Sequence, residues 1–265
     1  MSTPWVIQDS AILAKRYLLR YVRVPAFIVF SAIQPVMFVL LFAFVFGGSI
    51  AVAGSNYHEF LVPGIMAQTI VFSCFVVATG LTNDLEKGIV DRLKSLPISR
   101  ASLLVGRSIS SLIHSSIGVA VMALTGLLIG WGISNGVGNA VLAFALLLLF
   151  GFAMIWFGIW VGSIMRTVES VQGFMFTAIF PLTFVANTFA PTAKMPSWLQ
   201  PIAEWNPVSA LTQSLRVLWG NGPVAPDSAA WPLQHPEIST VFWSVLITAV
   251  FAPLALVAFR RRSRD

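Results

Sequence analysis

Residues 140–164 read AVLAFALLLLFGFAMIWFGIWVGSI, an apolar run without a single charged side chain. A helix of about 20 such residues is long enough to cross the roughly 30 Å hydrocarbon layer of a bilayer. Inside a bilayer a helix satisfies its own backbone hydrogen bonds, so an apolar run of this length is stable there. The stretch therefore predicts a transmembrane helix.

Five more apolar runs of similar length lie along the chain, at 26–46, 60–81, 109–129, 171–189 and 240–259. The whole sequence is 57% hydrophobic and 10% charged, whereas about 25% of the residues of an ordinary soluble domain are charged. We find no internal repeat and no low-complexity tract. The sequence predicts an all-α integral membrane protein, with six transmembrane helices in one domain over residues 1–265.

The formal net charge is +6, and a basic protein could bind nucleic acid. In a multi-pass membrane protein, however, Lys and Arg gather in the cytoplasmic segments. All but Lys194 and Arg216 of the 16 Lys and Arg residues fall on one side of the six predicted spans. We therefore expect a multi-pass protein of the cell membrane (the plasma or inner membrane) with both termini cytoplasmic, and no nucleic-acid partner.

Two features near the first spans have plain interpretations. Arg20 and Arg23 precede the run 26–46, and Ala51-Val52-Ala53 follows it, as in a signal peptide with its cleavage site. The run is longer than the 7 to 15 apolar residues of a signal peptide, so we expect an uncleaved first span. Cys74 is the only cysteine, which excludes an intramolecular disulfide and a multi-cysteine metal site.

The N-terminal segment, residues 1–25, has amphipathic character. Arg16, Arg20 and Arg23 share one face of a helix, and Ala14 and Leu18 lie on the opposite face. This pattern is typical of a helix that lies along the cytoplasmic leaflet of the membrane. A simple basic flank to the first span is the alternative interpretation.

The apolar runs carry few groups that could drive transport. None of the ten acidic residues lies deep in a run, and His114 is the only histidine near a membrane interior. A proton-driven pump usually needs such groups, and we expect His114 to form a hydrogen bond between packed helices. The sequence also lacks a phosphate-binding G-x-x-x-x-G-K-[ST] motif, a metal-ligand cluster and a G-x-S-x-G motif. Any energy for transport must then come from a partner.

The predicted cytoplasmic loop after the second span contains residues 83–99, NDLEKGIVDRLKSLPIS. Leu85, Ile89, Leu93 and Leu96 repeat at helical spacing, and Pro97 is a stop signal. The pattern predicts a short amphipathic helix that inserts its apolar face into a groove of another protein. A helix lying at the lipid headgroups is an equally good interpretation.

The segment that follows the fifth span is unusual in composition. Residues 180–207 contain five prolines, which exclude one continuous helix, and Trp198 and Trp205 suit the headgroup level. Irregular backbone at membrane depth must be shielded by protein or line a wet cavity. We expect a re-entrant hairpin at 190–220 on the outer side, between the fifth and sixth spans, with an interfacial loop as the alternative.

These two segments, in this order and topology, resemble those of ABC-2 type permeases, in particular the daunorubicin/doxorubicin-resistance-like exporter subunits. The resemblance extends over essentially the whole chain. In the cytoplasmic loop it is carried by Glu86, Gly88, Leu93, Lys94, Leu96, Pro97 and Ile98, and in the outer segment by Pro191, Pro196 to Pro201 and Asn206-Pro207. Residues 83–87 are less acidic and contain no arginine, unlike the usual family pattern, which leaves the exact contact residues open.

The resemblance implies a role for each group of residues. The ATPase-coupling residues would be Glu86, Lys87, Gly88, Asp91, Leu93, Lys94, Leu96 and Pro97. The outer gate would contain Pro191, Pro196, Trp198, Pro201, Trp205, Asn206 and Pro207. The interfacial helix, with Arg16, Arg20 and Arg23, would share in docking the ATPase.

The resemblance also implies the assembly and its work. Two permease subunits, identical or different, would pair in the membrane and bind two copies of a cytoplasmic ABC ATPase. The ATPase would bind ATP and Mg, whereas this chain would hold no cofactor and would not be an enzyme. The cargo would be an amphipathic drug, a lipid or a lipid-linked glycan, taken from the cytoplasm or the inner leaflet. A self-contained ion- or proton-coupled multidrug carrier and a membrane enzyme acting on lipids are the alternatives.

Overall fold

A computed structural model describes residues 3–23, 25–46, 56–94 and 100–262, and every regular element in that part of the chain is a helix. The long helices are α1 (Thr3–Arg23), α2 (Pro25–Leu41), α3 (Tyr57–Glu86), α5 (Arg100–Leu128), α6 (Gly136–Ile164), α7 (Val168–Val185) and α11 (Pro236–Arg262). The short ones are the π-helix η1 (Phe42–Phe46), α4 (Ile89–Lys94), the 3-10 helix η2 (Thr192–Lys194), α8 (Gln200–Glu204), α9 (Pro207–Trp219) and α10 (Trp231–Gln234).

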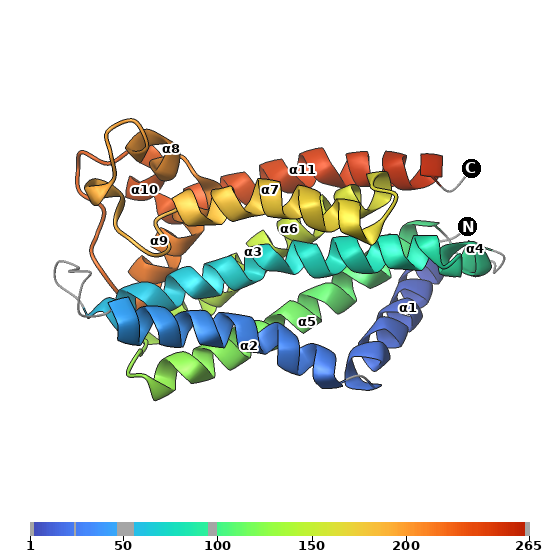
Figure 1. Cartoon of the computed structure of the whole chain (residues 1–265), viewed down its shortest axis with the longest axis horizontal. Helices are drawn as coiled ribbons and strands as arrows, with labels where there is room; N and C mark the ends of the chain where they lie inside the picture. The colour runs from blue at the N-terminus through green and yellow to red at the C-terminus, as the bar shows by residue number, and fades with distance from the viewer. Residues whose placement is uncertain (1–2, 24, 47–55, 95–99, 263–265) are drawn as a thin grey trace.

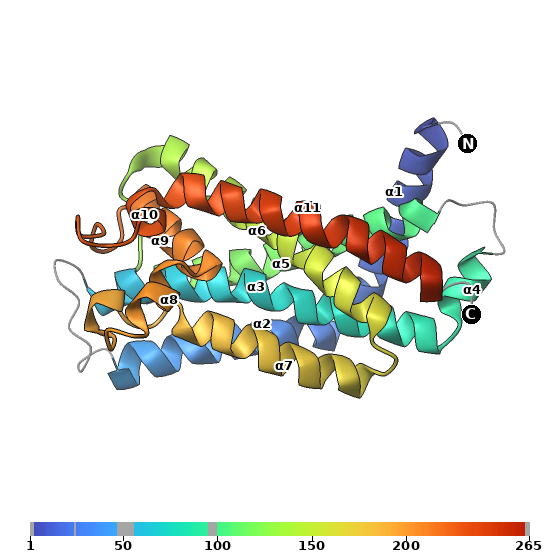
Figure 2. The same cartoon turned by 90° about the horizontal axis from the view of Figure 1, so that it is seen from above.

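Six of the long helices run side by side along the long axis of the molecule, and α1 lies across one end of them (Figures 1 and 2). In the described part of the chain, five helices are long and apolar enough to cross a membrane: α3, α5, α6, α7 and α11. They lie over the second to sixth predicted spans. The first predicted span, 26–46, corresponds to α2 and η1, in which the shorter segment Ile33–Val45 is apolar.

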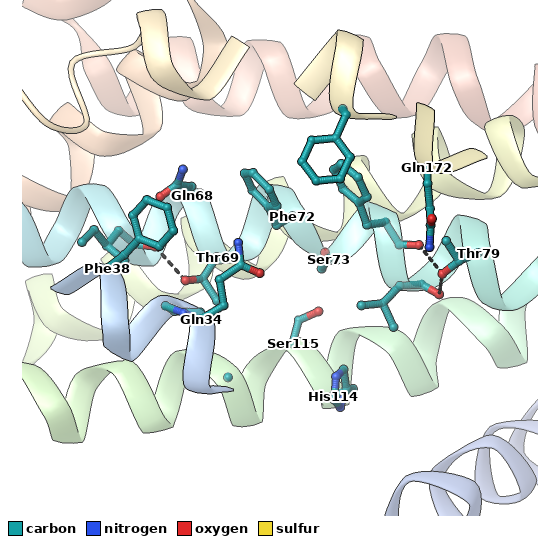
Figure 3. Close-up of a pocket in the computed structure, with 16 residues that line it drawn as sticks. Gln34, Phe38, Gln68, Thr69, Phe72, Ser73, Thr79, His114, Ser115 and Gln172 are labelled. Carbon is teal, nitrogen blue, oxygen red and sulfur yellow. Dashed lines mark hydrogen bonds between the residues drawn. The ribbon is translucent and has the colours of Figure 1, made fainter. Parts of the chain in front are cut away.

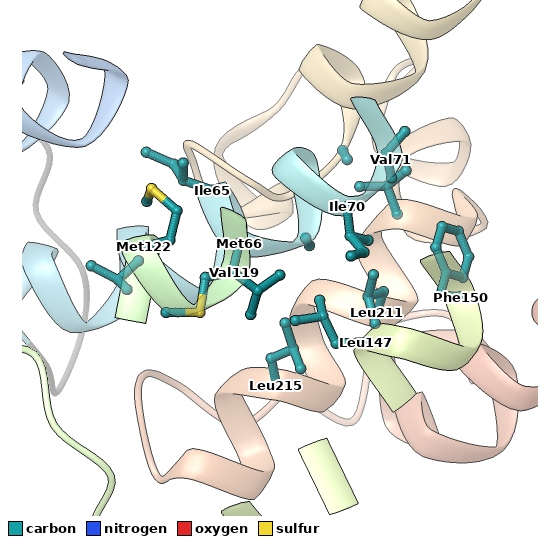
Figure 4. Packing of buried hydrophobic residues seen from close by; sticks show 14 of the residues in the cluster. Ile65, Met66, Ile70, Val71, Val119, Met122, Leu147, Phe150, Leu211 and Leu215 are labelled. Atoms are coloured by element: carbon teal, nitrogen blue, oxygen red, sulfur yellow. The ribbon is translucent and has the colours of Figure 1, made fainter. Parts of the chain in front are cut away.

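The centre of the bundle is α3, the most completely buried of the five helices. Its side chains pack against α5, α6 and α9, where Ile65, Met66, Ile70 and Val71 meet residues such as Leu147 (Figure 4). Gly158 and Gly162 of α6 lie directly against the backbone of α3, at Cys74 and Ala78. Small residues at such contacts let two membrane helices approach closely. The resulting van der Waals packing stabilises the pair, because the hydrophobic effect does not drive helices together in lipid.

The outer surface of the bundle is apolar. The helix α11 is the least buried of the five, and its exposed side chains include Val241, Phe242, Val245 and Val250. A contiguous exposed apolar surface of this kind would aggregate in water and is stable against lipid tails. The arrangement confirms the predicted class, an all-α integral membrane protein.

The two ends of the bundle differ. α1, α4 and the last turn of α11 lie at one end, and α8, α9 and α10 lie at the other (Figures 1 and 2). We call them the α1–α4 end and the α8–α10 end. Most of the described Lys and Arg residues are at the α1–α4 end, on helices α1, α4, α5 and α11 and on the α6–α7 loop.

Both irregular segments of the sequence differ in detail from the expected elements. The helix expected over 83–99 is divided, because α3 continues to Glu86 and α4 begins at Ile89. The break is at Gly88, whose φ of 63° is a left-handed conformation that glycine adopts without strain. The outer segment expected over 190–220 forms η2, α8 and α9, and its entry into the outer leaflet remains a prediction.

Candidate functional site

The predicted coupling residues lie at the α1–α4 end. Glu86 and Lys87 are exposed, at the last turn and the C-cap of α3. Asp91, Leu93 and Lys94 belong to α4 by their backbone, whereas Leu96 and Pro97 lie outside the described residues. The Lys87 and Gly88 amides donate to Asn83 O and Leu85 O, so the turn is fixed to the last residues of α3.

A buried ion pair joins this end of α3 to α5. Arg107 Nη1 of α5 donates to Asp84 Oδ2 of α3 at 2.7 Å, and the two side chains are only 8% and 2% exposed. The Arg107 guanidinium also lies 5.2 Å from the centre of the Tyr17 ring on α1. Burial raises the pKa of Tyr17, although the Arg107 charge opposes that shift. One cation thus connects three helices.

Close packing holds α1 against α5 as well. A Cβ at Gly106 of α5 would collide with Ser10 O and with the Leu13 side chain of α1. Leu13 and Ala14 are buried, and Arg16 is exposed. Of the other two predicted interfacial arginines, Arg23 is exposed and the Arg20 side chain lies outside the description. α1 therefore has a protein-facing side and a basic outer side.

The end of α11 joins the same cluster. Arg262 donates hydrogen bonds to the carbonyl oxygens of Gly162, Met165 and Arg166, where α6 ends. Carbonyl groups in the last turn of a helix have no partner within it, so a cation there is stabilising. The Arg262 guanidinium therefore fixes the end of α11 to the end of α6.

At the α8–α10 end, Arg216 of α9 forms a fully buried clamp. Its guanidinium lies 3.4 Å from the centre of the Phe60 ring, and it donates to Phe60 O, Asn187 O and Thr188 O at 2.9 to 3.2 Å. Phe60 belongs to α3, whereas Asn187 and Thr188 follow α7. The clamp therefore holds the segment that follows the end of α7 against the first turns of α3.

The predicted outer-gate residues lie between Thr188 and Arg216 of this clamp in sequence, and they differ in burial. Asn206 caps α9, since its Oδ1 accepts from Val208 N and its Nδ2 donates to Leu182 O. Pro207 then begins the helix. Trp198 and Trp205 are 70% and 57% exposed, as expected of side chains at the headgroup level. Pro191, Pro196 and Pro201 occupy the turns before and within η2 and α8.

A cavity of about 460 Å³ lies between α2, α3, α5 and α7, part-way along the bundle (Figure 3). Three glutamines, Gln34, Gln68 and Gln172, line it together with His114. The remaining lining residues are Pro35, Phe38, Ile65, Thr69, Phe72, Ser73, Phe75, Val76, Thr79, Ser115, Gly118 and Phe176. The glutamines occupy both ends of the cavity in Figure 3, with Gln34 and Gln68 at one end and Gln172 at the other.

Among the residues that the structure describes, no group of three or more His, Cys, Asp or Glu could hold an ion. The arrangement is that of a helical bundle with the predicted coupling residues at one end, the Arg216 clamp at the other end and a cavity between them.

Residues 9–219 match the model of the family described as ABC-2 type transporter. The chain belongs to the ABC-2 type transporter family. It is 28% identical to a daunorubicin resistance ABC transporter permease protein of Streptomyces coeruleorubidus, over 94% of this chain and 84% of that protein. It is 26% identical to a protein named as a transport permease in Cyanophora paradoxa, over 96% and 89% of the two chains.

A third relative of this ABC-2 family member has a name of the same kind. It is named as a doxorubicin resistance ABC transporter permease protein of Mycobacterium tuberculosis, and the two are 23% identical over 97% of this chain and 90% of the other. The comparisons confirm the resemblance on which the sequence analysis relied.

Several structurally central residues of this ABC-2 chain escaped the sequence analysis. Counting charges gives only the side of the membrane for Arg107 and Arg216, and it says nothing of the partner of Asp84. The cavity glutamines are not ionisable, so the acidic and histidine content of the apolar runs does not indicate them. Gln34 and Gln68 within such runs were a readable signal, because an amide is costly in hydrocarbon unless it faces a partner or a cavity.

Proposed function

We propose that this chain is the membrane-spanning subunit of an ATP-driven exporter. The chain belongs to a transporter family, and relatives that it matches over most of their length are named as ABC transporter permease proteins. Its own sequence has no phosphate-binding loop, so a separate cytoplasmic ATPase would bind ATP and Mg. The permease itself would do no covalent chemistry.

The observation that carries this proposal is the connection between α1 and the α3–α4 turn. Both are docking candidates, and Arg107 contacts both of them, through the Tyr17 ring and the Asp84 carboxylate. An ATPase subunit that pressed on Glu86 and Lys87 would move α3, α5 and α1 as one body, because a packed interior transmits displacement. Two ATPase copies would act on two permease subunits, identical or different.

The proposed placement follows the distribution of charge. The α1–α4 end would face the cytoplasm, with both termini there, and the α8–α10 end would face outward from the cell membrane. Closure of the ATPases on ATP would bias the bundle toward an outward-open state. The outer segment, 190–220, would act as the gate, and the Arg216 clamp would hold it against α3 in the state described here. An amphipathic drug, a lipid or a lipid-linked glycan would leave from the cytoplasm or the inner leaflet.

Co-purification tests the proposal first. Native membranes are solubilised in mild detergent, and the chain is isolated with whatever binds it. We expect a stoichiometric ATP-binding subunit and ATP hydrolysis by the assembly. Export that proceeds without ATP, from a chain that never carries an ATPase, would instead establish a self-contained ion- or proton-coupled carrier.

A charge variant then tests the docking end. Glu86→Gln should leave membrane insertion intact and lower the cargo exported per ATP hydrolysed several-fold, since Glu86 is exposed at the turn against which the ATPase would press. Glu169→Gln is the matched control, because Glu169 is another exposed carboxylate at the same end, in the first turn of α7. Equal coupling in both variants would contradict the assignment of Glu86.

A further inference from the structure

Residues 186–189, which follow α7 at the α8–α10 end, are held by side chains of other elements, and we call them the strap. Four of its backbone groups bond to side chains of α9 or α3: Asn187 N to Ser209 Oγ at 3.0 Å, Asn187 O and Thr188 O to Arg216 Nη2 at 2.9 and 3.2 Å, and Phe189 O to Tyr57 Oη at 3.3 Å. Bonds of this kind can be exchanged for bonds to water at a small net cost, and no helix has to unwind.

Two side-chain oxygens of the strap are buried without a hydrogen bond. Asn187 and Thr188 are 4% and 0% exposed, and neither Asn187 Oδ1 nor Thr188 Oγ1 has a partner among the residues that the structure describes. A buried polar atom without a partner destabilises the state in which it is buried. Both oxygens would gain water partners if the strap moved out, so its release costs less than its four backbone bonds alone would suggest.

The strap also lies directly on the backbone of α3. A Cβ at Gly64 would come 2.5 Å from Thr188 O. The Phe189 ring stacks on Phe42 of η1, with ring centroids 4.5 Å apart. The strap therefore bridges η1, α3 and α9, and its removal would open the bundle between these elements.

The helix α9 is attached to the rest of the bundle by separate contacts. The α5–α6 loop bonds to its last carbonyl groups, since Ser134 Oγ donates to Trp219 O at 3.1 Å and Asn135 Nδ2 donates to Val217 O at 2.8 Å. These carbonyls have no partner within the helix, so the loop is a cap that stabilises its end. The Ser214 hydroxyl is hydrogen-bonded to α11. None of these contacts involves the strap, so α9 can stay in place while the strap moves.

The helix α7, which leads into the strap, is held less firmly than the other side of this contact. Its buried residues Val171, Met175, Ile179 and Thr183 recur at every fourth position and form one narrow stripe. The helix is also much less buried than α3. Elements with few buried contacts are those that move at a low cost in free energy.

We propose that the strap is the moving part of the outer gate, that α9 is its fixed frame, and that Arg216 holds the strap closed. The inference rests on the proposed export function and divides its gate into a part that moves and a part that does not. When the bundle opens, α7 carries the strap away from α9. Arg216 then loses its two bonds to the strap, but it keeps the bond to Phe60 O and the contact with the Phe60 ring. Its charge therefore still has a partner in the open state.

Thiol labelling measures release of the strap. In a Cys74→Ala background, Thr188→Cys is introduced in the strap or Ser214→Cys in α9, and both native side chains are 0% exposed. The full chain in phosphatidylcholine nanodiscs, without ATP, is treated with a membrane-impermeant maleimide, and both thiols should react slowly. Arg216→Met should speed the labelling of Thr188→Cys by at least about tenfold, the effect of roughly 1.4 kcal/mol, and should leave Ser214→Cys slow.

A milder variant separates release of the strap from general unfolding. Tyr57→Phe keeps the ring and removes the hydroxyl that donates to Phe189 O, so it should speed the labelling of Thr188→Cys several-fold. Ser244→Ala is the matched control, because Ser244 is a buried hydroxyl on α11 that bonds to Thr240 O and not to the strap. It should leave the labelling unchanged.

Two results would contradict the proposal. If Arg216→Met and Tyr57→Phe labelled Thr188→Cys no faster than Ser244→Ala does, the strap would not be a releasable element. If Tyr57→Phe sped the labelling of Ser214→Cys as much as that of Thr188→Cys, α9 would move with the strap and would not be a fixed frame.

Labelling without ATP requires no ATPase, so its failure is distinct from failure of the proposed function. In the assembly with the ATPase, ATP and vanadate should speed the labelling of Thr188→Cys and leave Ser214→Cys slow. ATP-dependent export in which Thr188→Cys stays slow in every state would sink only the strap. Release of the strap by Arg216→Met, in a chain that never associates with an ATPase, would sink only the ATP-driven mechanism.

Discussion

The pair Arg107 and Asp84 shows how one residue can hold several elements together. A buried ion pair adds little net stability, but removal of one partner leaves the other charge in a poorly solvated place. Arg107→Met should therefore cost about 3–5 kcal/mol, seen as a lower unfolding temperature of the chain in detergent. The double variant Arg107→Met with Asp84→Leu should recover most of that loss, because neither charge then remains buried.

A surface variant provides the control for this pair. Arg166 is exposed in the loop between α6 and α7, so Arg166→Met should change stability by less than about 0.5 kcal/mol. If Arg107→Met lowered the unfolding temperature no more than Arg166→Met, or if the double variant were no more stable than the single one, the ion pair would not hold α3 and α5 together.

At the scale of the helix, the contact between α6 and α3 depends on glycine residues, which have no side chain to separate the two helices. A Cβ at Gly158 would come 2.5 Å from Cys74 O, on the backbone of α3. Backbone cannot move aside as a flexible side chain can, so Gly158→Val should separate the two helices and cost at least about 1–3 kcal/mol. The measurement is the yield of monodisperse protein after solubilisation, together with its unfolding temperature.

Gly173 provides the matched position on another helix. Nothing lies within 4 Å of a Cβ built there on α7, so Gly173→Val should fold as the unchanged chain does. Similar yields and unfolding temperatures for the two valine variants would contradict the view that close backbone approach fixes α6 on α3.

The sequence predicted most of the helices but not all of the contacts that position them. Long apolar runs such as 140–164 predicted the five helices that are long and apolar enough to cross a membrane, because crossing lipid requires length and apolarity and little else. The sequence also predicted the break before α8 from its prolines. It did not reveal the division at Gly88, which needs a backbone angle, or the Arg216 clamp, whose three acceptors are carbonyls and leave no mark in the sequence. Partners distant along the chain were likewise invisible for Asp84 and Tyr17.

On the scale of the whole molecule, the two ends of the bundle differ in charge, and this difference supports the proposed orientation. The α1–α4 end holds the exposed Arg16, Arg23 and Lys87, whereas the α8–α10 end holds Lys194 and the buried Arg216. Cytoplasmic segments usually carry the excess of Lys and Arg, which supports the proposed orientation with the α1–α4 end in the cytoplasm. ATP is available to a docked ATPase on that side, so the proposed mechanism requires the same orientation.

Cysteine labelling tests this orientation directly. Cys74 is fully buried, so Cys74→Ala gives a background without a thiol, into which Ser170→Cys or Ser197→Cys is introduced. Both serines are exposed, Ser170 in the first turn of α7 and Ser197 in the turn before α8. A membrane-impermeant maleimide should label Ser197→Cys in intact cells, and Ser170→Cys only after the membrane is opened. The reverse pattern would place Glu86 and α4 outside the cell, where no ATPase could reach them, and would therefore refute the coupling mechanism along with the topology.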